Sequence, residues 1–353
     1  MLHVPITAGW FLALLCVITV ALVTGTVLAF RRSRGWKPWL AGGVSVLVVV
    51  VTVAAFINAH YSYYLWLDEL TDERTWPDAA GKGPHLDGGV LSTAIPGQTS
   101  KVSAGDAIVY LPPQYWSEPK RAFPVVYLIH GTPGAPDDMF RAGRASDAGL
   151  AAARSGFPVI VVAPSVGQDW TSDTECVNGA QGQWDTYASV DVVAAVDHNL
   201  RTIHSREGRA IGGMSMGGYC ALNLGLQHRD TFSTIFDLSG ETGPSFDAGM
   251  PALFGRVPDL TAVVNANTPG TYVSKLPALP LERIWLDCGE DDDTGPLEDM
   301  TAIAPKLQAR GFDVVFKTRD GGHEWAVWRA ALSESIPWAA AAITATTSVG
   351  PPV

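Results

Sequence analysis

The sequence predicts an α/β domain, with a mostly parallel sheet covered by helices on both faces, preceded by two membrane-spanning helices. Three observations support this prediction. Two uncharged apolar runs open the chain of 353 residues. After about residue 88, short runs rich in β-branched residues alternate with stretches of helical spacing. The short runs are apolar almost throughout, as is typical of strands buried on both faces of a sheet.

The two apolar runs lie at residues 10–30 and 39–58, and neither contains a charged residue. Each is about 20 residues long, enough to cross the roughly 30 Å hydrocarbon core of a bilayer. A buried core helix and a cleaved signal peptide are the alternatives. The first ten residues contain no Lys or Arg, whereas a signal peptide begins with a basic segment. We therefore expect a membrane hairpin over residues 1–60.

The charges around the hairpin predict its orientation. The connector 31–38 carries Arg31, Arg32, Arg34 and Lys37, the only charged residues before Asp68. Because cytoplasmic loops are enriched in Lys and Arg, we expect this connector in the cytoplasm and the rest of the chain outside it. Tyrosines and a tryptophan at residues 61–66 suit the outer membrane interface. The lipid bilayer is thus an expected partner.

The overall charge excludes several kinds of partner. Of the 24 Lys and Arg residues, four lie in the connector, and the other 20 stand against 35 Asp and Glu, a balance of about −15. This balance argues against a role in binding nucleic acid or an anionic membrane surface.

The cysteines allow one disulfide and indicate no metal site. Cys16 lies in the first span, which leaves Cys176, Cys220 and Cys288 outside it. Cys220 falls on a predicted buried helix, so we expect Cys176 to pair with Cys288 if any pair forms. No CxxC motif or Cys/His cluster is present, and we expect neither a metal nor an organic cofactor.

Beyond the hairpin we expect a polar linker at 61–87, one α/β domain at 88–345 and a loose tail at 346–353. The predicted strands lie within 89–97, 107–113, 123–131, 157–165, 209–215, 233–240, 283–290 and 312–318. The predicted helices lie within 147–156, 186–202, 218–230, 300–311 and 324–345.

The stretch GGMSMGG at 212–218 contains a Gly-x-Ser-x-Gly pattern centred on Ser215. Ser215 directly follows a predicted apolar strand and directly precedes a predicted helix, the context that a nucleophile elbow requires. The turn is strained, and side chains at Gly213 and Gly217 would collide with the neighbouring strand or helix. The helix N-terminus would stabilise developing negative charge. The sequence therefore predicts Ser215 as a nucleophile.

A serine nucleophile needs a base, and only His228 and His323 follow it in the chain. His228 lies in the helix after Ser215, where we expect a surface or capping residue. His323 lies in the loop RDGGHEW after a strand. This loop lies near the C-terminal end of the sheet, where ligand sites are commonly found, and we expect His323 to be the base. The acid that orients it should be one of the four carboxylates at 290–293, and spacing alone leaves the choice open.

Residues 88–340 resemble the esterase D / secreted mycolyltransferase (antigen 85-like) family of α/β-hydrolases. The resemblance rests on VYLPPQYW, VVYLIHGTPG, GGMSMGGY, FDLSG, LDCGEDD and GGHEWAVW. It implies the α/β-hydrolase fold. The family's Cys-Gly-x-x-Asp pattern implies Asp292 as the acid, with Asp291 as the second choice. The aromatic residues after the histidine match Trp325 and Trp328.

The same resemblance implies the rest of the site. The backbone N–H groups of Met216 and Thr132 would form the oxyanion hole. We expect His130, beside this loop, to be mainly structural, with substrate contact as the alternative. Trp170 and Trp184 lie in a Trp- and Gly-rich loop that resembles the region beside the acyl groove of the mycolyltransferases. They are candidates for substrate contact, as is Trp325; the alternative for Trp170 and Trp184 is that they pack this loop onto the sheet.

The sequence thus predicts a membrane-anchored, extracytoplasmic serine esterase acting on a small-molecule or lipid ester, with an envelope glycolipid as one candidate. Two departures from the mycolyltransferases, a shorter aspartate-bearing acid loop and the two spans, leave the acyl acceptor open. The first alternative is an acyltransferase that passes the acyl group to a sugar or envelope acceptor. The second is an inactive hydrolase fold that only binds glycans or lipids. The resemblance suggests an actinobacterial cell envelope.

Overall fold

The computed structural model describes residues 4–32, 35–70, 88–277 and 282–348, with side chains up to residue 344. These residues form two compact units, and each is described by itself. Most of the predicted linker, residues 71–87, and the last five residues of the predicted tail, 349–353, lie outside the described residues.

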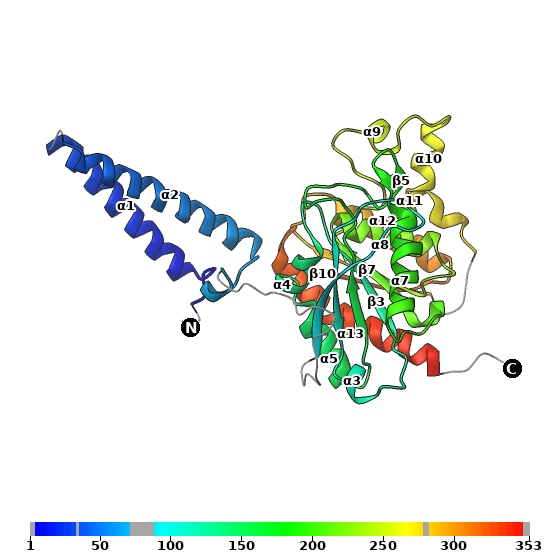
Figure 1. Cartoon of the computed structure of the whole chain (residues 1–353). Helices are drawn as coiled ribbons and strands as arrows, with labels where there is room; N and C mark the ends of the chain where they lie inside the picture. The colour runs from blue at the N-terminus through cyan, green and yellow to red at the C-terminus, as the bar shows by residue number, and fades with distance from the viewer. Residues whose placement is uncertain (1–3, 33–34, 71–87, 278–281, 349–353) are drawn as a thin grey trace. The chain divides into compact units, whose positions relative to one another are not determined.

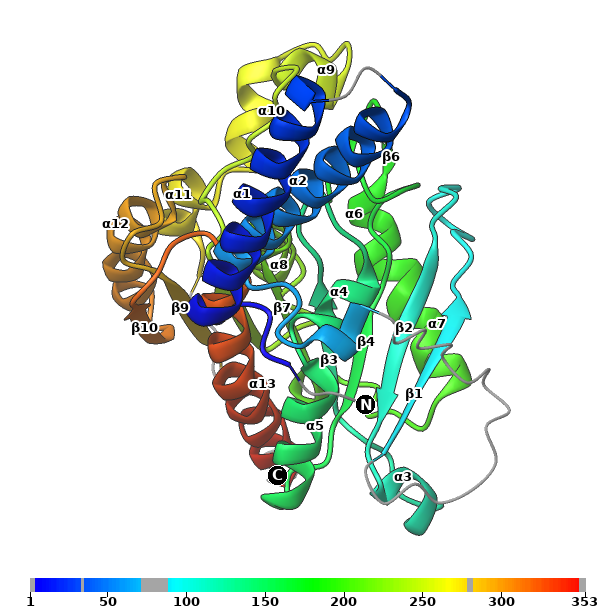
Figure 2. The same cartoon turned by 90° about the vertical axis from the view of Figure 1, so that its left-hand side faces the viewer.

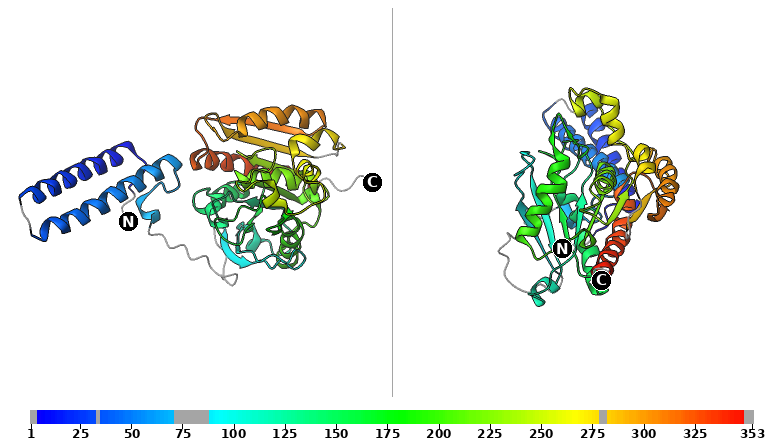
Figure 3. Two further views of the ribbon diagram at one scale, coloured as in Figure 1. Left: turned by 90° about the horizontal axis from the view of Figure 1, so that it is seen from above. Right: turned by 90° about the vertical axis from the view of Figure 1, so that its right-hand side faces the viewer.

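The N-terminal unit is a hairpin of two helices, α1 (Gly9–Arg32) and α2 (Lys37–Tyr61), which run side by side in opposite directions (Figure 3). They contain the two predicted apolar runs and are followed by the 3-10 turn η1 (Leu67–Leu70). Each helix is long and apolar enough to cross a membrane, with a mean hydropathy of 2.6 over its most apolar window. Length and composition alone are also compatible with a signal sequence.

Polar side chains join the two helices along one stripe. The hydroxyl oxygens of Thr19 and Thr52 are 2.7 Å apart, and those of Thr26 and Ser45 are 2.8 Å apart. Large apolar side chains cover the other faces; Val17 on α1 and Val46 on α2 are among the most exposed. The helices therefore pack on each other through hydroxyl pairs and present an apolar exterior.

The second unit is an α/β domain (Figure 1). Its large sheet consists of β1 (Gly89–Ala94), β2 (Asp106–Leu111), β3 (Val125–Ile129), β4 (Ile160–Ala163), β7 (Arg209–Met214), β8 (Thr234–Leu238), β9 (Arg283–Gly289) and β10 (Asp313–Arg319). A second, two-stranded sheet consists of β5 (Asn178–Gly179) and β6 (Gly182–Gln183).

The helices of this unit vary widely in length. They are α3 (Gln114–Ser117), α4 (Pro136–Arg141), α5 (Ala145–Arg154), α6 (Trp184–Thr186), α7 (Val192–Asn199), α8 (Met216–Gln227), α9 (Met250–Phe254), α10 (Leu260–Ala266), α11 (Pro269–Tyr272), α12 (Pro296–Ala309) and α13 (Trp325–Ser348). Shorter turns are the π-helical turn η2 (Tyr187–Asp191) and the 3-10 turns η3 (Arg206–Gly208) and η4 (Val273–Lys275).

The strand order of the large sheet is β1-β2-β4-β3-β7-β8-β9-β10. Only β2 pairs antiparallel, with β1 on one side and β4 on the other; all other neighbouring strands of this sheet are parallel. Every residue of β3, β4, β7 and β8 is buried. The α5 and α13 helices lie on one face of the sheet, and α7, α8 and α12 lie on the other (Figure 2). The predicted mostly parallel sheet flanked by helices is confirmed.

Two long excursions leave the sheet at the carboxyl ends of their strands. The first, residues 164–191, follows β4 and contains β5, β6, α6 and η2. The second, from residue 239 to β9, follows β8 and contains α9, α10 and α11. The N–H of Ala180 donates to the carbonyl of Leu253 at 2.8 Å, which joins the two excursions. Val177, Leu253 and Phe254 form a small apolar cluster at this junction.

A disulfide ties the first excursion to α8. It joins Cys176 to Cys220, with their Cα atoms 5.5 Å apart, while Cys288 is a free, buried thiol on β9. The expected pairing of Cys176 with Cys288 is therefore wrong. The expectation depends on the position of Cys220 on a buried helix, which makes the other pair the more favourable one. The first excursion, however, packs directly on that helix, so Cys176 is buried against it.

Candidate active site

Ser215 occupies a strained turn between β7 and α8. Its φ and ψ are 54° and −128°, and its N–H donates to the carbonyl of Leu238 on the next strand at 2.8 Å. A Cβ on Gly213 would lie 2.1 Å from the carbonyl oxygen of Gly217. A Cβ on Gly217 would lie 2.3 Å from the carbonyl oxygen of Ile129. The turn therefore needs both glycines, as a nucleophile elbow does.

The structure brings Ser215, His323 and Asp292 together in one hydrogen-bonded chain. The Oγ of Ser215 lies 2.8 Å from Nε2 of His323, and Nδ1 of His323 lies 2.9 Å from Oδ2 of Asp292. His323 comes from the loop between β10 and α13, and Asp292 from the loop after β9. Three separate segments at the C-terminal ends of the strands thus bring the three side chains together.

Asp292 is held in place as a carboxylate. Its side chain has no exposed surface, and its Oδ1 accepts hydrogen bonds from the hydroxyl of Thr294 at 2.6 Å and from the Thr294 N–H at 3.2 Å. Burial acts to raise the pKa of Asp292, but the hydrogen bonds with His323 and Thr294 outweigh it and lower the pKa. The second candidate, Asp291, is exposed, and its N–H donates to the carbonyl of Gly321.

Two side chains at the site were not predicted from the sequence. The hydroxyl of Thr294 is also 3.2 Å from Nδ1 of His323, so it touches both members of the pair. Glu241, on the loop after β8, is half-buried. Burial raises its pKa, and this effect outweighs the hydrogen bond with Ser245 and the nearby His323, which lower it. An Asp-x-Thr spacing, in which a threonine can bond the carboxylate two residues before it, was a signal for Thr294. Glu241 had no such signal.

The loop after β3 lies against the elbow. A Cβ on Gly131 would come within 3.2 Å of the Ser215 Cβ. The hydroxyl of Thr132 is 3.1 Å from Sδ of Met216 and donates to the carbonyl of Ser172 at 3.1 Å. None of the described residues accepts a hydrogen bond from the N–H of Thr132 or from that of Met216. Both predicted oxyanion donors thus come from segments that touch Ser215.

The side chain of His130 is buried, and backbone groups engage both of its ring nitrogens. The N–H of Val166 donates to Nε2 at 3.2 Å, so Nδ1 carries the proton and donates to the carbonyl of Gly131 at 2.9 Å. Burial lowers the pKa of His130. This histidine connects the loop after β3 to the loop after β4, and the structural role expected for it fits this geometry.

The three tryptophans proposed as substrate contacts lie in different settings. Trp184 is buried, donates from Nε1 to the carbonyl of Gln181 and packs edge-on against Tyr187, a setting that fits the alternative in which it packs its loop. Trp170 is 64% exposed, and its carbonyl accepts from the N–H of Gly134 at 2.8 Å, next to the Thr132 loop. Trp325 is the first residue of α13.

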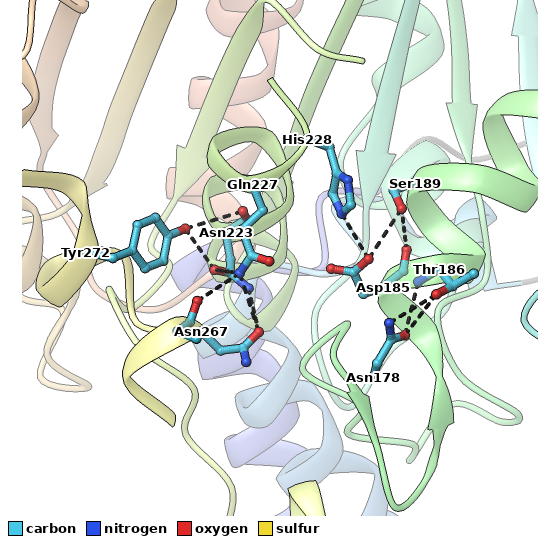
Figure 4. A network of polar contacts seen from close by, with 10 residues as sticks. Asn178, Asp185, Thr186, Ser189, Asn223, Gln227, His228, Asn267 and Tyr272 are labelled. Carbon is cyan, nitrogen blue, oxygen red and sulfur yellow. Dashed lines mark hydrogen bonds and ion pairs between the residues drawn. The ribbon is translucent and has the colours of Figure 1, made fainter. Parts of the chain in front are cut away.

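The two excursions are fastened to opposite sides of α8 by polar side chains (Figure 4). On one side, Oδ1 of Asn223 accepts from the hydroxyl of Tyr272 and from Nε2 of Gln227, both at 2.9 Å. On the other side, Nε2 of His228 is 2.9 Å from Oδ1 of Asp185. His228 is the residue that caps the C-terminal end of α8, as predicted.

Comparison with known proteins identifies the family. The esterase family model, described as "Putative esterase", matches residues 104–339, about two thirds of the chain. An uncharacterized protein of Corynebacterium glutamicum is 26% identical over 83% of this chain and 74% of its own length. The diacylglycerol acyltransferase/mycolyltransferase Ag85A of Mycobacterium leprae is 26% identical over 51% of this chain and 64% of that protein.

Solved structures share the fold. A ferulic acid esterase superimposes with a TM-score of 0.62 at 24% identity, covering 73% of this chain and all of that one. A fluorophosphonate-binding serine hydrolase of Staphylococcus aureus superimposes with a TM-score of 0.59 at 19% identity, covering 73% of this chain and 99% of that one. Together with the family match, they make the α/β-hydrolase fold and the serine hydrolase class plain: the chain belongs to the esterase family.

Proposed function

We propose that this protein is a membrane-anchored, extracytoplasmic serine esterase that works through a Ser215–His323–Asp292 triad and an acyl-enzyme. The observation that carries the proposal is the unbroken chain of hydrogen bonds from Ser215 Oγ through both nitrogens of His323 to Asp292. Such a chain is what activates a serine hydroxyl, which is otherwise a poor nucleophile.

In the acylation step, Oγ of Ser215 attacks the ester carbonyl while Nε2 of His323 takes the hydroxyl proton. The oxygen of the tetrahedral intermediate lies against the N–H groups of Met216 and Thr132, at the N-terminus of α8. His323 then gives its proton to the departing alkoxide, the ester C–O bond breaks, and the acyl group remains on Ser215. Asp292 stabilises the imidazolium and stays ionised, consistent with its lowered pKa.

In the deacylation step, His323 takes a proton from water, whose oxygen attacks the acyl carbonyl. The tetrahedral intermediate uses the same two N–H donors. It collapses with return of the proton from His323 to Ser215 Oγ, which releases the carboxylic acid. A hydroxyl group of a second substrate in place of water would release an ester instead, so the same residues support acyl transfer.

Two observations support the membrane anchor and its orientation. The hydroxyl pairs Thr19–Thr52 and Thr26–Ser45 join α1 to α2, as in a hairpin that stays in the bilayer rather than a signal sequence that is removed. The Cys176–Cys220 disulfide fits an oxidising compartment, in agreement with the basic connector on the cytoplasmic side.

A second candidate function is acyl transfer to a sugar or cell-envelope acceptor. The observation that favours it is the similarity to the diacylglycerol acyltransferase/mycolyltransferase Ag85A, a protein named for acyl transfer. The two candidates share every catalytic residue and differ only in the acceptor of the second step.

The esterase proposal is tested with p-nitrophenyl esters and the detergent-solubilised full chain. We expect hydrolysis by the wild type and none above background for Ser215→Ala. Ser333→Ala, at an exposed serine of α13, serves as the matched control and should keep wild-type activity. Unchanged hydrolysis by a folded Ser215→Ala variant would refute the triad.

The acceptor is tested by following the fate of the acyl group with and without trehalose. Release of free acid at an unchanged rate supports the esterase. Formation of an acylated sugar at the expense of free acid establishes the transferase and excludes simple hydrolysis as the main reaction.

The topology is tested by treating intact cells with protease. We expect the domain after residue 88 to be degraded while the hairpin stays in the membrane fraction. A domain that is cut only after the cells are lysed would overturn the extracytoplasmic placement.

A further inference from the structure

Asp237 is a fully buried carboxyl group that the triad does not use. It lies on β8, next to the strand that ends at Ser215, and has no exposed surface. Its Oδ1 accepts a hydrogen bond from the N–H of Gly240 at 2.8 Å. Its Oδ2 is buried, and no described residue gives it a hydrogen-bond partner. A buried polar atom of this kind calls for an explanation.

The Asp237 carboxyl fills the space between the first turn of α8 and the loop after β8. A Cβ on Gly218 would lie 2.3 Å from Oδ1 of Asp237, and a Cβ on Gly240 would lie 2.3 Å from the same oxygen. This explains why glycine follows the Gly-x-Ser-x-Gly pattern at position 218. Gly218 shares its helical turn with Met216, so a displacement of Gly218 also moves the Met216 N–H.

The side chains around Asp237 do not favour a negative charge on it. The titratable groups that face it are Asp299 on α12 and the Cys288 thiol on β9. Its partners on the adjacent strands, Gly213 and Leu286, are uncharged.

The backbone around Asp237 supplies only one donor to offset a charge. The N–H groups of Gly218 and Tyr219 already donate to the carbonyl of Ser215. Burial raises the pKa of Asp237, the hydrogen bond from Gly240 lowers it and the nearby Asp299 raises it, and together they bring the pKa to about 8. The surroundings of Asp237 therefore favour the neutral acid near pH 7.

We propose that Asp237 is a positioning residue that supports the first turn of α8 as a neutral carboxylic acid, and that loss of its proton shifts the Met216 N–H away from the oxyanion. An unpaired charge buried against this turn is costly, and the turn moves or admits water to relieve it. The inference rests on the proposed triad chemistry. It predicts that activity falls at alkaline pH through kcat rather than through KM.

The test compares the pH profiles of wild type and Asp237→Asn with p-nitrophenyl butyrate, each normalised to its own kcat at about pH 7. Asparagine can still accept from Gly240 N–H and cannot ionise. We expect kcat of the wild type to fall at least tenfold between about pH 7 and about pH 10, and that of Asp237→Asn to stay level. Asp185→Asn, which removes an acid at the other end of α8, should keep the wild-type profile.

An alkaline fall that is the same in Asp237→Asn and wild type would overturn the inference. So would a folded Asp237→Asn that is inactive at every pH, because the charge itself would then be needed. Labelling of Ser215 by a fluorophosphonate separates this failure from a failure of the triad. If Ser215 is still labelled, only the role of Asp237 is lost.

A second variant leaves Asp237 untouched, so the test stands even if Asp237→Asn does not fold. Asp299→Asn keeps the acceptor that holds Thr242 but removes the negative charge facing Asp237. Without that charge Asp237 loses its proton more easily, so we expect the alkaline fall in kcat to move to lower pH. A fall that does not move, or that moves to higher pH, would contradict the proposal.

Discussion

A histidine–carboxylate pair lies near each end of α8, the helix that follows Ser215. The two pairs are similar in their nitrogen–oxygen distances and in the exposure of their histidines. At the N-terminal end, Nδ1 of His323 is 2.9 Å from Asp292; at the C-terminal end, Nε2 of His228 is 2.9 Å from Asp185. The histidine side chains are 26% and 28% exposed. The pairs differ in which ring nitrogen faces the carboxylate, and above all in the partner of the other ring nitrogen. In His323 it lies 2.8 Å from Ser215 Oγ, whereas no described residue bonds that of His228.

This difference shows that a histidine–carboxylate pair is not by itself a catalytic device. At the C-terminus of α8, the hydrogen bond with Asp185 raises the pKa of His228, and a cation there is favourable to the helix. At the N-terminus, the strained turn presents Ser215 to the other nitrogen of His323, and the catalytic role proposed for this pair depends on that contact. We therefore expect matched substitutions in the two pairs to have very different consequences.

The largest effect is expected from the histidines. His323→Gln should lower kcat by about 10⁴-fold or more, because no base remains to take the Ser215 proton. His228→Gln should leave kcat within about twofold of wild type, since it acts only on the helix end. Steady-state kinetics on the two purified variants measures both kcat values. Equal losses of kcat would contradict the distinction between the two pairs.

Substitution of the triad carboxylate is expected to lower kcat somewhat less than substitution of the triad histidine. Asp292→Asn should lower kcat by roughly 10⁴-fold, because the amide favours the wrong histidine tautomer and cannot stabilise the imidazolium. Asp185→Asn should have little effect on kcat. Asp291→Asn is a further control for the choice of acid, and a loss there that exceeds the loss in Asp292→Asn would reassign the triad.

Thr294 should have an intermediate effect because it holds Asp292 in place. Thr294→Val removes the hydroxyl that bonds both Asp292 and His323 and should lower kcat about tenfold with KM nearly unchanged. Thr294→Ser retains the hydroxyl and should recover most of the loss. If both variants are equally impaired, the methyl group rather than the hydrogen bond supports the site.

The smallest effect is expected on stability. Because the folded protein raises the pKa of His228 above its ordinary value of 6.5, its stabilising contribution is complete below that pH and is lost as pH rises through the raised value. The free energy of unfolding of wild type should exceed that of His228→Gln by up to about 1 kcal/mol at about pH 5.5 and by less at about pH 9. Denaturant titrations at the two pH values measure this difference. A constant difference would mean that His228 does not carry the charge.

Sequence patterns predicted the eight strands of the main sheet because buried parallel strands are short apolar runs, and these stand out from the helical spacing between them. They also pointed to Ser215 and His323, which the structure places 2.8 Å apart, since the elbow needs its glycines locally and only two histidines follow it. The acid came from a family pattern rather than from physical spacing, and the structure places that residue, Asp292, on His323.

The features that sequence patterns missed or left open have a common physical cause, which is long-range packing. The Cys176–Cys220 bond and the burial of Trp184 both depend on how the first excursion folds back over α8, and no local pattern encodes that path. The sequence predicts no role for Asp237 beyond its strand and the stretch FDLSG, because its contact with Gly218 joins two separate elements.

The most direct test of the central claim is to map the site of fluorophosphonate labelling by peptide mass spectrometry on the full chain. The triad geometry predicts one modified peptide carrying the adduct on Ser215, with labelling abolished in His323→Gln and retained in His228→Gln. An enzyme that hydrolyses esters while its Ser215 peptide stays unmodified would contradict the assignment of Ser215 as the nucleophile.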